Sequence, residues 1–206
     1  AASNGRSATV QVLSDSIAAD GASRAAVVVQ LAGDTPLGTE VTVTTDMGTL
    51  AGSGQPAGQQ LKYNAGSRTD TLVLVSGLRA GVATVTVQTG KSFASDSVRM
   101  TAATPQFIEL TTDATRATAT GEDAITATAK LYRPLGAGTV TLGTRVRFDV
   151  YNAGTPVPSL SGISETNDAG TATHRITSRT AGTYLLVASA AGKADSVTIV
   201  FDPPPP

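Results

Sequence analysis

His174 belongs to a residue type that often takes part in catalysis and metal binding, and it is the only histidine in this chain, from which cysteine is absent. A Ser-His-Asp triad or a histidine-rich metal site could be built only with this residue. His174 lies between Ala172 and Ile176 on one face of an alternating segment. We expect a partly buried, hydrogen-bonded histidine with a structural role, and we keep a switch or ligand role as the lesser alternative. The lack of cysteine also removes disulfides, thiolate nucleophiles and cysteine-based zinc sites.

The carboxylates are spread along the chain rather than gathered into a metal-binding pattern. Calcium takes roughly six or more oxygen ligands, and no Asp-x-Asp-x-Asp run supplies them. Turn chemistry and surface solvation explain these residues better, and no two carboxylates are set apart for glycoside hydrolysis. We therefore predict no catalytic, cofactor-binding or metal-binding residue and no cofactor. The acidic residues considered are Asp15, Asp20, Asp96, Asp113, Glu122, Asp123 and Asp168.

Charge and loop composition argue against phosphate-bearing and membrane partners. Lys and Arg number 15 against 16 Asp and Glu, and the arginines lack interleaved aromatic residues, so nucleic acid is not an expected partner. The glycine-rich loops Gly52-Ser53-Gly54 and Gly136-Ala137-Gly138 do not lead from a strand into a helix, as phosphate-binding loops do. No apolar run approaches the roughly 18 residues of a membrane span. The opening Ala1–Gly5 is no signal peptide, so we expect any export signal or anchor to lie outside this fragment.

Aromatic residues make up only 4% of the chain and tryptophan is absent, so the core must rely on Val, Leu, Ile and Ala. Tyr184, Phe148 and Phe107 stand in strand-like runs and are predicted to be core residues. Tyr132 and Tyr63 are the better candidates for exposure, and hence for a sugar-binding surface.

Alternation with a period of two dominates the sequence, and no segment sustains an apolar period of 3.6 residues. Breakers such as Ala19-Asp20-Gly21, Asn152-Ala153-Gly154 and Asn167-Asp168-Ala169-Gly170 separate the alternating runs at short intervals. This pattern predicts an all-β chain of β-sandwich type. Typical runs are Val41-Thr42-Val43-Thr44, Ala83-Thr84-Val85-Thr86-Val87 and Arg145-Val146-Arg147-Phe148.

The two halves of the chain repeat one another in order, which predicts two domains of about one hundred residues. Gly38–Val43 matches Gly143–Phe148, Arg79–Val82 matches Thr180–Thr183, and Ala94–Val98 matches Lys193–Val197. The boundary is predicted within Thr101–Pro105, so we expect one module over 1–103, a second over 104–202 and the start of a proline-rich linker at 203–206. The short connection predicts an elongated, end-to-end pair with restricted bending.

The second half carries a recognisable signature, Thr166-Asn167-Asp168-Ala169-Gly170-Thr171-Ala172-Thr173 followed by Ile176-Thr177-Ser178-Arg179-Thr180-Ala181-Gly182. It resembles the bacterial Ig-like domain of group 1, the module repeated along invasin and intimin-type adhesins. In the first half, Ala18–Ser23 is similar to the early Ala-Asp-Gly-x-Ser turn of that family. The first half has Asn64–Arg68 where the second has its Thr-x-Asp turn, and the second half lacks the aspartate before Gly121. The resemblance implies two tandem immunoglobulin-like β-sandwiches.

By analogy with that family, we expect an extracellular stalk or spacer of a bacterial cell-surface adhesin, supporting adhesion by presenting a distal binding domain. Its partners would then be other domains of the same surface protein and, through them, a protein or glycan receptor. Two alternatives stay open. One module could itself bind a glycan or a partner protein through end loops, such as Gly52–Gly58 or Arg133–Gly138, or through a sheet edge. The pair could also be accessory domains of a secreted hydrolase.

Overall fold

The computed structural model describes residues 8–206, so the opening Ala1–Gly5 and our expectation about it lie outside the described residues. All regular elements in 8–206 are β-strands, and this part of the chain contains no helix long and apolar enough to cross a bilayer. The prediction of an all-β chain is therefore confirmed. The chain divides into two compact units, one comprising residues up to Ala103 with Gly136–Gly138, the other comprising the rest.

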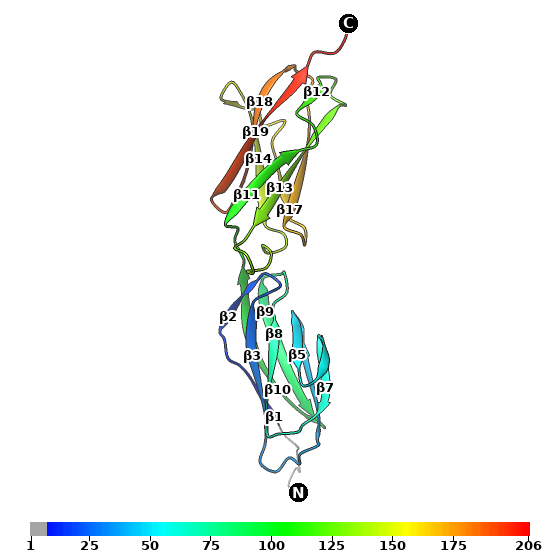
Figure 1. The fold of residues 1–206 in the computed structure, drawn as a ribbon, viewed down its shortest axis with the longest axis vertical. Coiled ribbons are helices and arrows are strands. Elements are labelled where there is room, and N and C mark those ends of the chain that lie inside the picture. The colour runs from blue at the N-terminus through cyan, green and yellow to red at the C-terminus, as the bar shows by residue number, and fades with distance from the viewer. Residues whose placement is uncertain (1–7) are drawn as a thin grey trace. The chain divides into compact units, whose positions relative to one another are not determined.

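The first unit is a sandwich of two five-stranded sheets (Figure 1). One has the order β1-β3-β8-β5-β6 and the other β2-β10-β9-β4-β7. Residues predicted as the loop Gly52–Gly58 in fact form much of the β5–β6 hairpin, so that part of the prediction is wrong. The strands are β1 (Ala8–Val12), β2 (Ser16–Ala19), β3 (Arg24–Leu31), β4 (Glu40–Thr45), β5 (Thr49–Gly52), β6 (Gln55–Gly58), β7 (Gln60–Asn64), β8 (Thr69–Val75), β9 (Gly81–Thr89) and β10 (Ser92–Ala102).

The second unit repeats this arrangement with a smaller first sheet. Its sheets have the orders β11-β13-β17 and β12-β19-β18-β14-β15, and β16 also pairs with β14. Thus β14, β18 and β19 take the places of β4, β9 and β10. The strands are β11 (Phe107–Thr112), β12 (Arg116–Thr118), β13 (Ala124–Tyr132), β14 (Arg145–Asn152), β15 (Thr155–Pro156), β16 (Gly162–Glu165), β17 (Thr171–Thr177), β18 (Gly182–Ala190) and β19 (Lys193–Asp202).

Each unit buries its own hydrophobic core between its two sheets, as strict alternation requires. In β4, Val41 and Val43 are fully buried while Thr42 and Thr44 face outward. Tyr63 is the only aromatic residue of the first core, whereas the second contains Phe148, Tyr184 and Phe201. The second core is therefore richer in large aromatic side chains.

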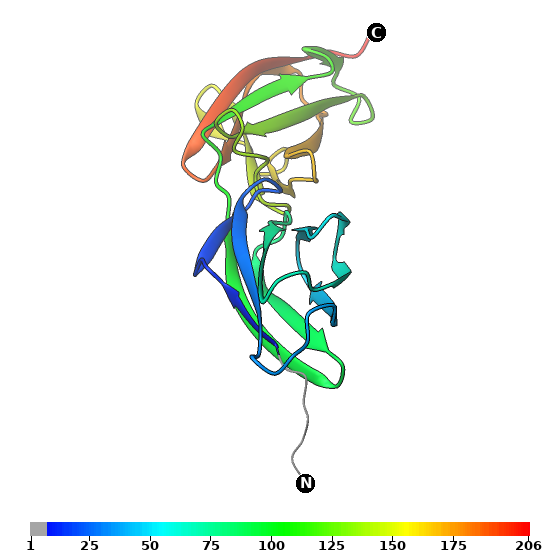
Figure 2. The same ribbon diagram turned by 60° about the horizontal axis from the view of Figure 1, so that its bottom comes forward.

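The second strand of each unit is a short edge strand that runs parallel to the last strand. In the first unit β2 pairs with β10 from Ser16 opposite Arg99 to Ala19 opposite Ala102. In the second unit β12 pairs with β19 from Arg116 opposite Val200 to Thr118 opposite Asp202. The chain consequently enters each sandwich at one end and leaves it at the other, and Figure 2 shows β10 running along the first unit.

Candidate functional site

The signature turn of the second unit is closed by Asn167 rather than by the neighbouring Asp168. The Asn167 side-chain oxygen accepts hydrogen bonds from the backbone N–H groups of Ala169 and Thr171, each at 3.0 Å. The buried Thr166 hydroxyl donates to the carbonyl oxygen of Thr141 and accepts from the N–H of Thr144 at 3.0 Å. Asp168 itself is exposed. The hydrogen bonds of these residues stabilise a turn, so the signature has a structural role rather than a chemical one.

The early turn of the first unit is organised by Asp20, which is only 2% exposed. Its carboxylate accepts from the N–H groups of Ala22 at 2.9 Å and Ser23 at 2.7 Å, and from the hydroxyls of Ser23 and Ser76. Burial alone would raise the pKa of Asp20, but these hydrogen bonds outweigh it, so the pKa lies below its ordinary value. An aspartate stabilised in this way is a structural anion.

Two further aspartates, Asp96 and Asp195, bind the backbone of the first strand in their respective units. Asp96 accepts from the N–H of Val12 and Asp195 from the N–H of Leu110, both at 2.8 Å. Each also accepts from the N–H of the serine that follows it. The matched sequence Asp-Ser-Val of the two halves thus serves one structural purpose: it fastens the last strand to the first.

His174 is half-buried in the second unit and contributes to packing. Its Nε2 lies 2.9 Å from the carbonyl oxygen of Leu160, and its ring stacks on Phe148 with centroids 5.3 Å apart. Gly162 leaves room for the ring, since a Cβ at that position would lie 2.5 Å from Cε1 of His174. Register places His174 opposite Ala127, where the first unit has the fully buried Leu72 opposite Val27. The histidine therefore occupies a position that an aliphatic side chain fills in the other unit.

The remaining carboxylates stay apart from one another. Among residues 8–206 no three His, Cys, Asp or Glu side chains gather in a way that could hold a metal ion. Asp113 accepts from the N–H of Thr126 at 2.7 Å, and chiefly this bond holds its pKa below the ordinary value. Arg147 pairs with Asp149 at 2.8 Å on the protein surface.

Two predictions about aromatic side chains are wrong. Tyr63, predicted as exposed, is only 9% exposed, because it shares the inward face of β7 with Leu61. Burial, followed by the nearby charge of Asp70, raises the pKa of Tyr63. Phe107, predicted as core, is 50% exposed, because its neighbour Ile108 takes the inward position and adjacent strand residues face opposite ways.

Phe107 instead stacks on Tyr132 across the β11–β13 pair, with ring centroids 4.6 Å apart and planes 11° from parallel. The Tyr132 hydroxyl donates to Glu109 at 2.7 Å, and this hydrogen bond raises the pKa of Tyr132. The ammonium of Lys130 lies 5.9 Å from the Tyr132 ring centroid. The polar end of Tyr132 is therefore already engaged within the protein.

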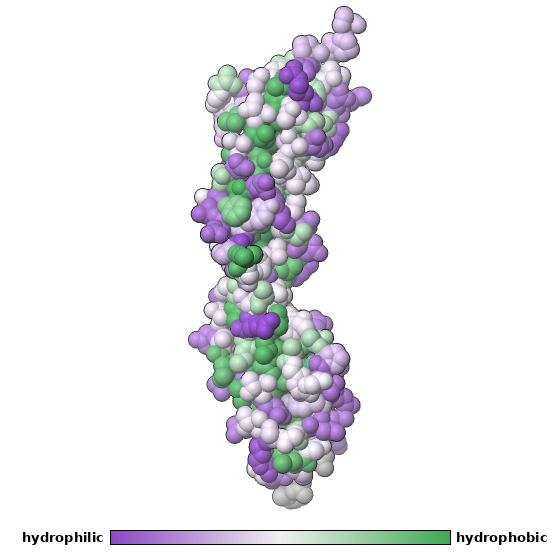
Figure 3. Space-filling view, viewed as in Figure 1, coloured by the Kyte–Doolittle hydropathy of each residue, from purple (hydrophilic) through white to green (hydrophobic). Residues whose placement is uncertain are grey.

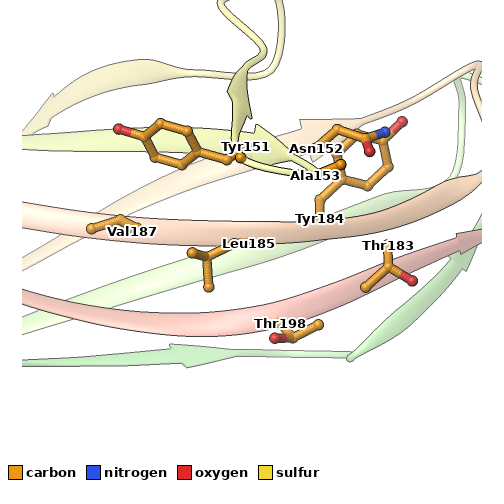
Figure 4. A pocket seen from close by; sticks show the side chains of 9 residues that line it. Tyr151, Asn152, Ala153, Thr183, Tyr184, Leu185, Val187 and Thr198 are labelled. Carbon is orange, nitrogen blue, oxygen red and sulfur yellow. The ribbon is translucent and has the colours of Figure 1, made fainter.

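A hollow that sequence reasoning did not identify lies on the outer face of β14, β18 and β19, and we call it the β14–β18 hollow (Figure 4). Its volume is about 700 Å³. Register places Tyr151 opposite Leu185, and Leu185 opposite Thr198, so the three side chains form one row across the sheet. The residues lining it are Tyr151, Asn152, Ala153, Gly154, Thr183, Tyr184, Leu185, Val187 and Thr198. The alternation of β14 was a usable signal, since Val150 inward implies Tyr151 outward.

Comparison with known proteins finds similar solved structures but no match by sequence. No protein-family model and no curated protein sequence matches the chain. Among solved structures, that of invasin, described as a bacterial integrin-binding protein, matches with a TM-score of 0.65 and 25% sequence identity over 97% of this chain. The Yersinia pseudotuberculosis adhesin InvE matches with a TM-score of 0.55 and 19% identity over 95% of this chain.

The chain spans 40% of the invasin structure and 58% of the InvE structure. Both structures are of adhesins, and both match nearly the whole of this chain. The chain accordingly has the immunoglobulin-like β-sandwich fold of invasin-type adhesins.

Proposed function

We propose that this chain is a structural stalk, or spacer, in a bacterial cell-surface adhesin of the invasin and intimin type. In this proposal residues 1–103 and 104–202 are two tandem modules of the bacterial Ig-like group 1 kind, and residues 203–206 begin a linker. The pair is extracellular, adjoins other domains of the same surface protein and holds a distal receptor-binding domain away from the cell. The similarity to invasin and InvE supports the adhesin setting.

The parallel pairing of the second strand with the last strand in each unit is the observation that carries this proposal. A spacer must add length by passing the chain from one end of each module to the other. The last strand of the first unit has 11 residues, which at about 3.3 Å per residue corresponds to roughly 36 Å of reach. Each module of this kind lengthens a stalk by a distance of this order.

The low charge of the chain fits a spacer that attracts few charged partners. Charged residues make up 15% of the chain and the net charge is −1. On the face shown in Figure 3, hydrophobic, pale and hydrophilic residues are interspersed. Such a surface gives little long-range electrostatic attraction to nucleic acid or to charged membranes.

Small-angle X-ray scattering of the chain in solution tests the proposal. A spacer predicts a particle whose maximum dimension is close to twice that of one sandwich and does not change with salt. A compact particle of near-spherical dimensions would contradict the spacer function.

A second experiment tests the adhesive setting in the longer surface protein that the proposal assumes. Residues 8–202 would be replaced by two unrelated Ig-like modules of equal length, and binding of bacteria to host cells would be counted. We expect binding to survive this replacement and to fall when the segment is simply deleted. Loss of binding with the equal-length replacement would show that the pair itself contacts the receptor.

A further inference from the structure

The β14–β18 hollow has the composition of a site for an uncharged polar ligand with one apolar face. Leu185, which is 43% exposed, and the half-buried Val187 contribute an apolar floor, and the Tyr151 ring lies beside them (Figure 4). None of the residues that line the hollow is charged. Asp149, which neighbours Val187 across the strands, is neutralised by its pairing with Arg147. A charged ligand would therefore find no opposite charge here.

Four polar side chains line the hollow beside these apolar residues. Within residues 8–206, the side chains of Tyr151, Asn152, Thr183 and Thr198 form no hydrogen bond with the protein, in contrast to the engaged hydroxyls of Tyr132 and Tyr184. They offer a phenol, a carboxamide with both donor and acceptor, and two hydroxyls. A volume of about 700 Å³ falls within the usual range for small-ligand sites.

The fold does not require these side chains, as the first unit shows. In the matching register the first unit has Thr86 where the second has Val187. One step further along, Asp46 and Thr84, whose backbones share a hydrogen bond, correspond to Tyr151 and Leu185. On the outer face of a sheet, exposed leucine and tyrosine side chains interact less favourably with water than threonine and aspartate do. Their presence in only one of two similar modules is therefore evidence for a ligand rather than for a folding role.

We propose that the β14–β18 hollow binds a neutral sugar ring. A pyranose has one face of C–H groups, which packs on a tyrosine ring and aliphatic side chains, and a rim of hydroxyls, which pair with amide and hydroxyl groups. Tyr151 stacks on the apolar face of the sugar, Leu185 and Val187 form the floor, and Asn152, Thr183 and Thr198 bind its hydroxyls. This site goes beyond the spacer function and is independent of it.

Nuclear magnetic resonance of the ¹⁵N-labelled chain tests the site directly. The probes are the methyl glycosides of glucose, galactose, mannose, N-acetylglucosamine and N-acetylgalactosamine, and β-linked disaccharides of the same sugars. We expect saturable shifts in the amides of Tyr151, Asn152, Leu185 and Thr198, with the first unit unaffected. Glucuronic acid should bind more weakly than glucose, because the site has no cation. The absence of shifts at these amides with every neutral sugar would overturn the proposal.

Variants separate the sugar site from unspecific effects. Tyr151→Ala should weaken the preferred sugar by roughly tenfold or more, and Leu185→Thr, which copies the first unit, should weaken it too. Tyr151→Phe should retain stacking and most of the affinity. Tyr132→Ala is the matched control, since it removes another surface aromatic of the same unit outside the hollow. Equal binding by wild type and Tyr151→Ala would overturn the proposal.

Two further measurements distinguish the sources of the ligand and a competing explanation. Stronger binding of N-acetyllactosamine and chitobiose points to host glycoproteins, whereas stronger binding of glucose oligosaccharides points to bacterial polysaccharide. Shifts at the same amides that depend on protein concentration without sugar would mean that two copies of the chain pair through this face, and would overturn sugar binding. The small-angle scattering result does not depend on whether the hollow binds sugar, so the spacer proposal is tested separately.

Discussion

The turn after β2 in the first unit and the turn after β12 in the second have the same backbone hydrogen-bonding requirement but use different acceptors. Asp20 accepts from the N–H groups of Ala22 and Ser23, and in addition from two hydroxyls. In the second unit the Thr120 hydroxyl accepts from the N–H groups of Glu122 and Asp123, each at 3.2 Å. The turn therefore needs an oxygen at this position, and the charge is an addition specific to the first unit.

A similar contrast separates the two cores. At matching positions the first unit has Val43, Ala83 and Met100, whereas the second has Phe148, Tyr184 and Phe201. Tyr184 and Phe201 meet edge to face, with ring centroids 5.9 Å apart. One backbone arrangement thus accommodates an aliphatic and an aromatic core. Val43 lies opposite Val87, whereas the larger Phe148 lies opposite the smaller Ala188, so a facing position compensates for the added volume.

The largest expected effect in this comparison is that of Phe148→Ala. The fully buried ring also supports His174, so its removal leaves a cavity and should destabilise the second unit by about 3–5 kcal/mol. Val43→Ala in the first unit should cost roughly 2 kcal/mol, because fewer buried methyl groups are lost. Denaturant unfolding with hydrogen exchange read by mass spectrometry assigns each loss to a unit. Equal losses of unfolding free energy in the two units would show that the aromatic side chains add no stability beyond that of an aliphatic core.

Next in size is the effect of removing the turn acceptors. Asp20→Ala leaves the N–H groups of Ala22 and Ser23 without their acceptor and should destabilise the first unit by about 2–3 kcal/mol. Thr120→Ala should destabilise the second unit by about 1 kcal/mol, because an exposed turn exchanges its bonds for water. The shift of the denaturant midpoint, measured unit by unit, checks the order. The reverse order would refute the view that charge and burial strengthen the first turn.

Acid should act on the first unit through Asp20 with a smaller effect. Because the folded pKa of Asp20 lies below its ordinary value of 3.8, the carboxylate stabilises the folded state fully above that value. This contribution is lost as the pH falls through the lower, folded-state pKa. Unfolding of the first unit, followed between pH about 5 and pH about 2, should thus be less steeply pH-dependent in Asp20→Asn than in wild type. The pKa of Asp113 is also lowered, so the stability of the second unit depends on pH as well. Wild type and Asp20→Asn must therefore be compared by the unfolding of the first unit alone.

The smallest effect concerns the hairpins that join β9 to β10 and β18 to β19. The first unit has Gly90 at φ 58°, whereas the second has Ala191 at φ 47° followed by Gly192. A left-handed conformation costs alanine more than glycine, so Ala191→Gly should stabilise the second unit by about 1 kcal/mol or slightly less. Differential scanning calorimetry should show a rise of a few degrees in the melting temperature of that unit. A fall would mean that unfolded-state entropy outweighs the relieved strain.

Local patterns in the sequence determined the strands, the turns and the repeated plan of this protein, because a turn is closed by residues a few positions apart. Asp20, Asn167 and the alternation of Val41 and Val43 belong to this class. Only the tertiary structure decided which side chains are covered, because that depends on strands distant in the sequence. It buried Tyr63, exposed Phe107, and brought Tyr151, Leu185 and Thr198 from three strands into one row. The β14–β18 hollow could not be found from any single segment, since each strand contributes only one side of it.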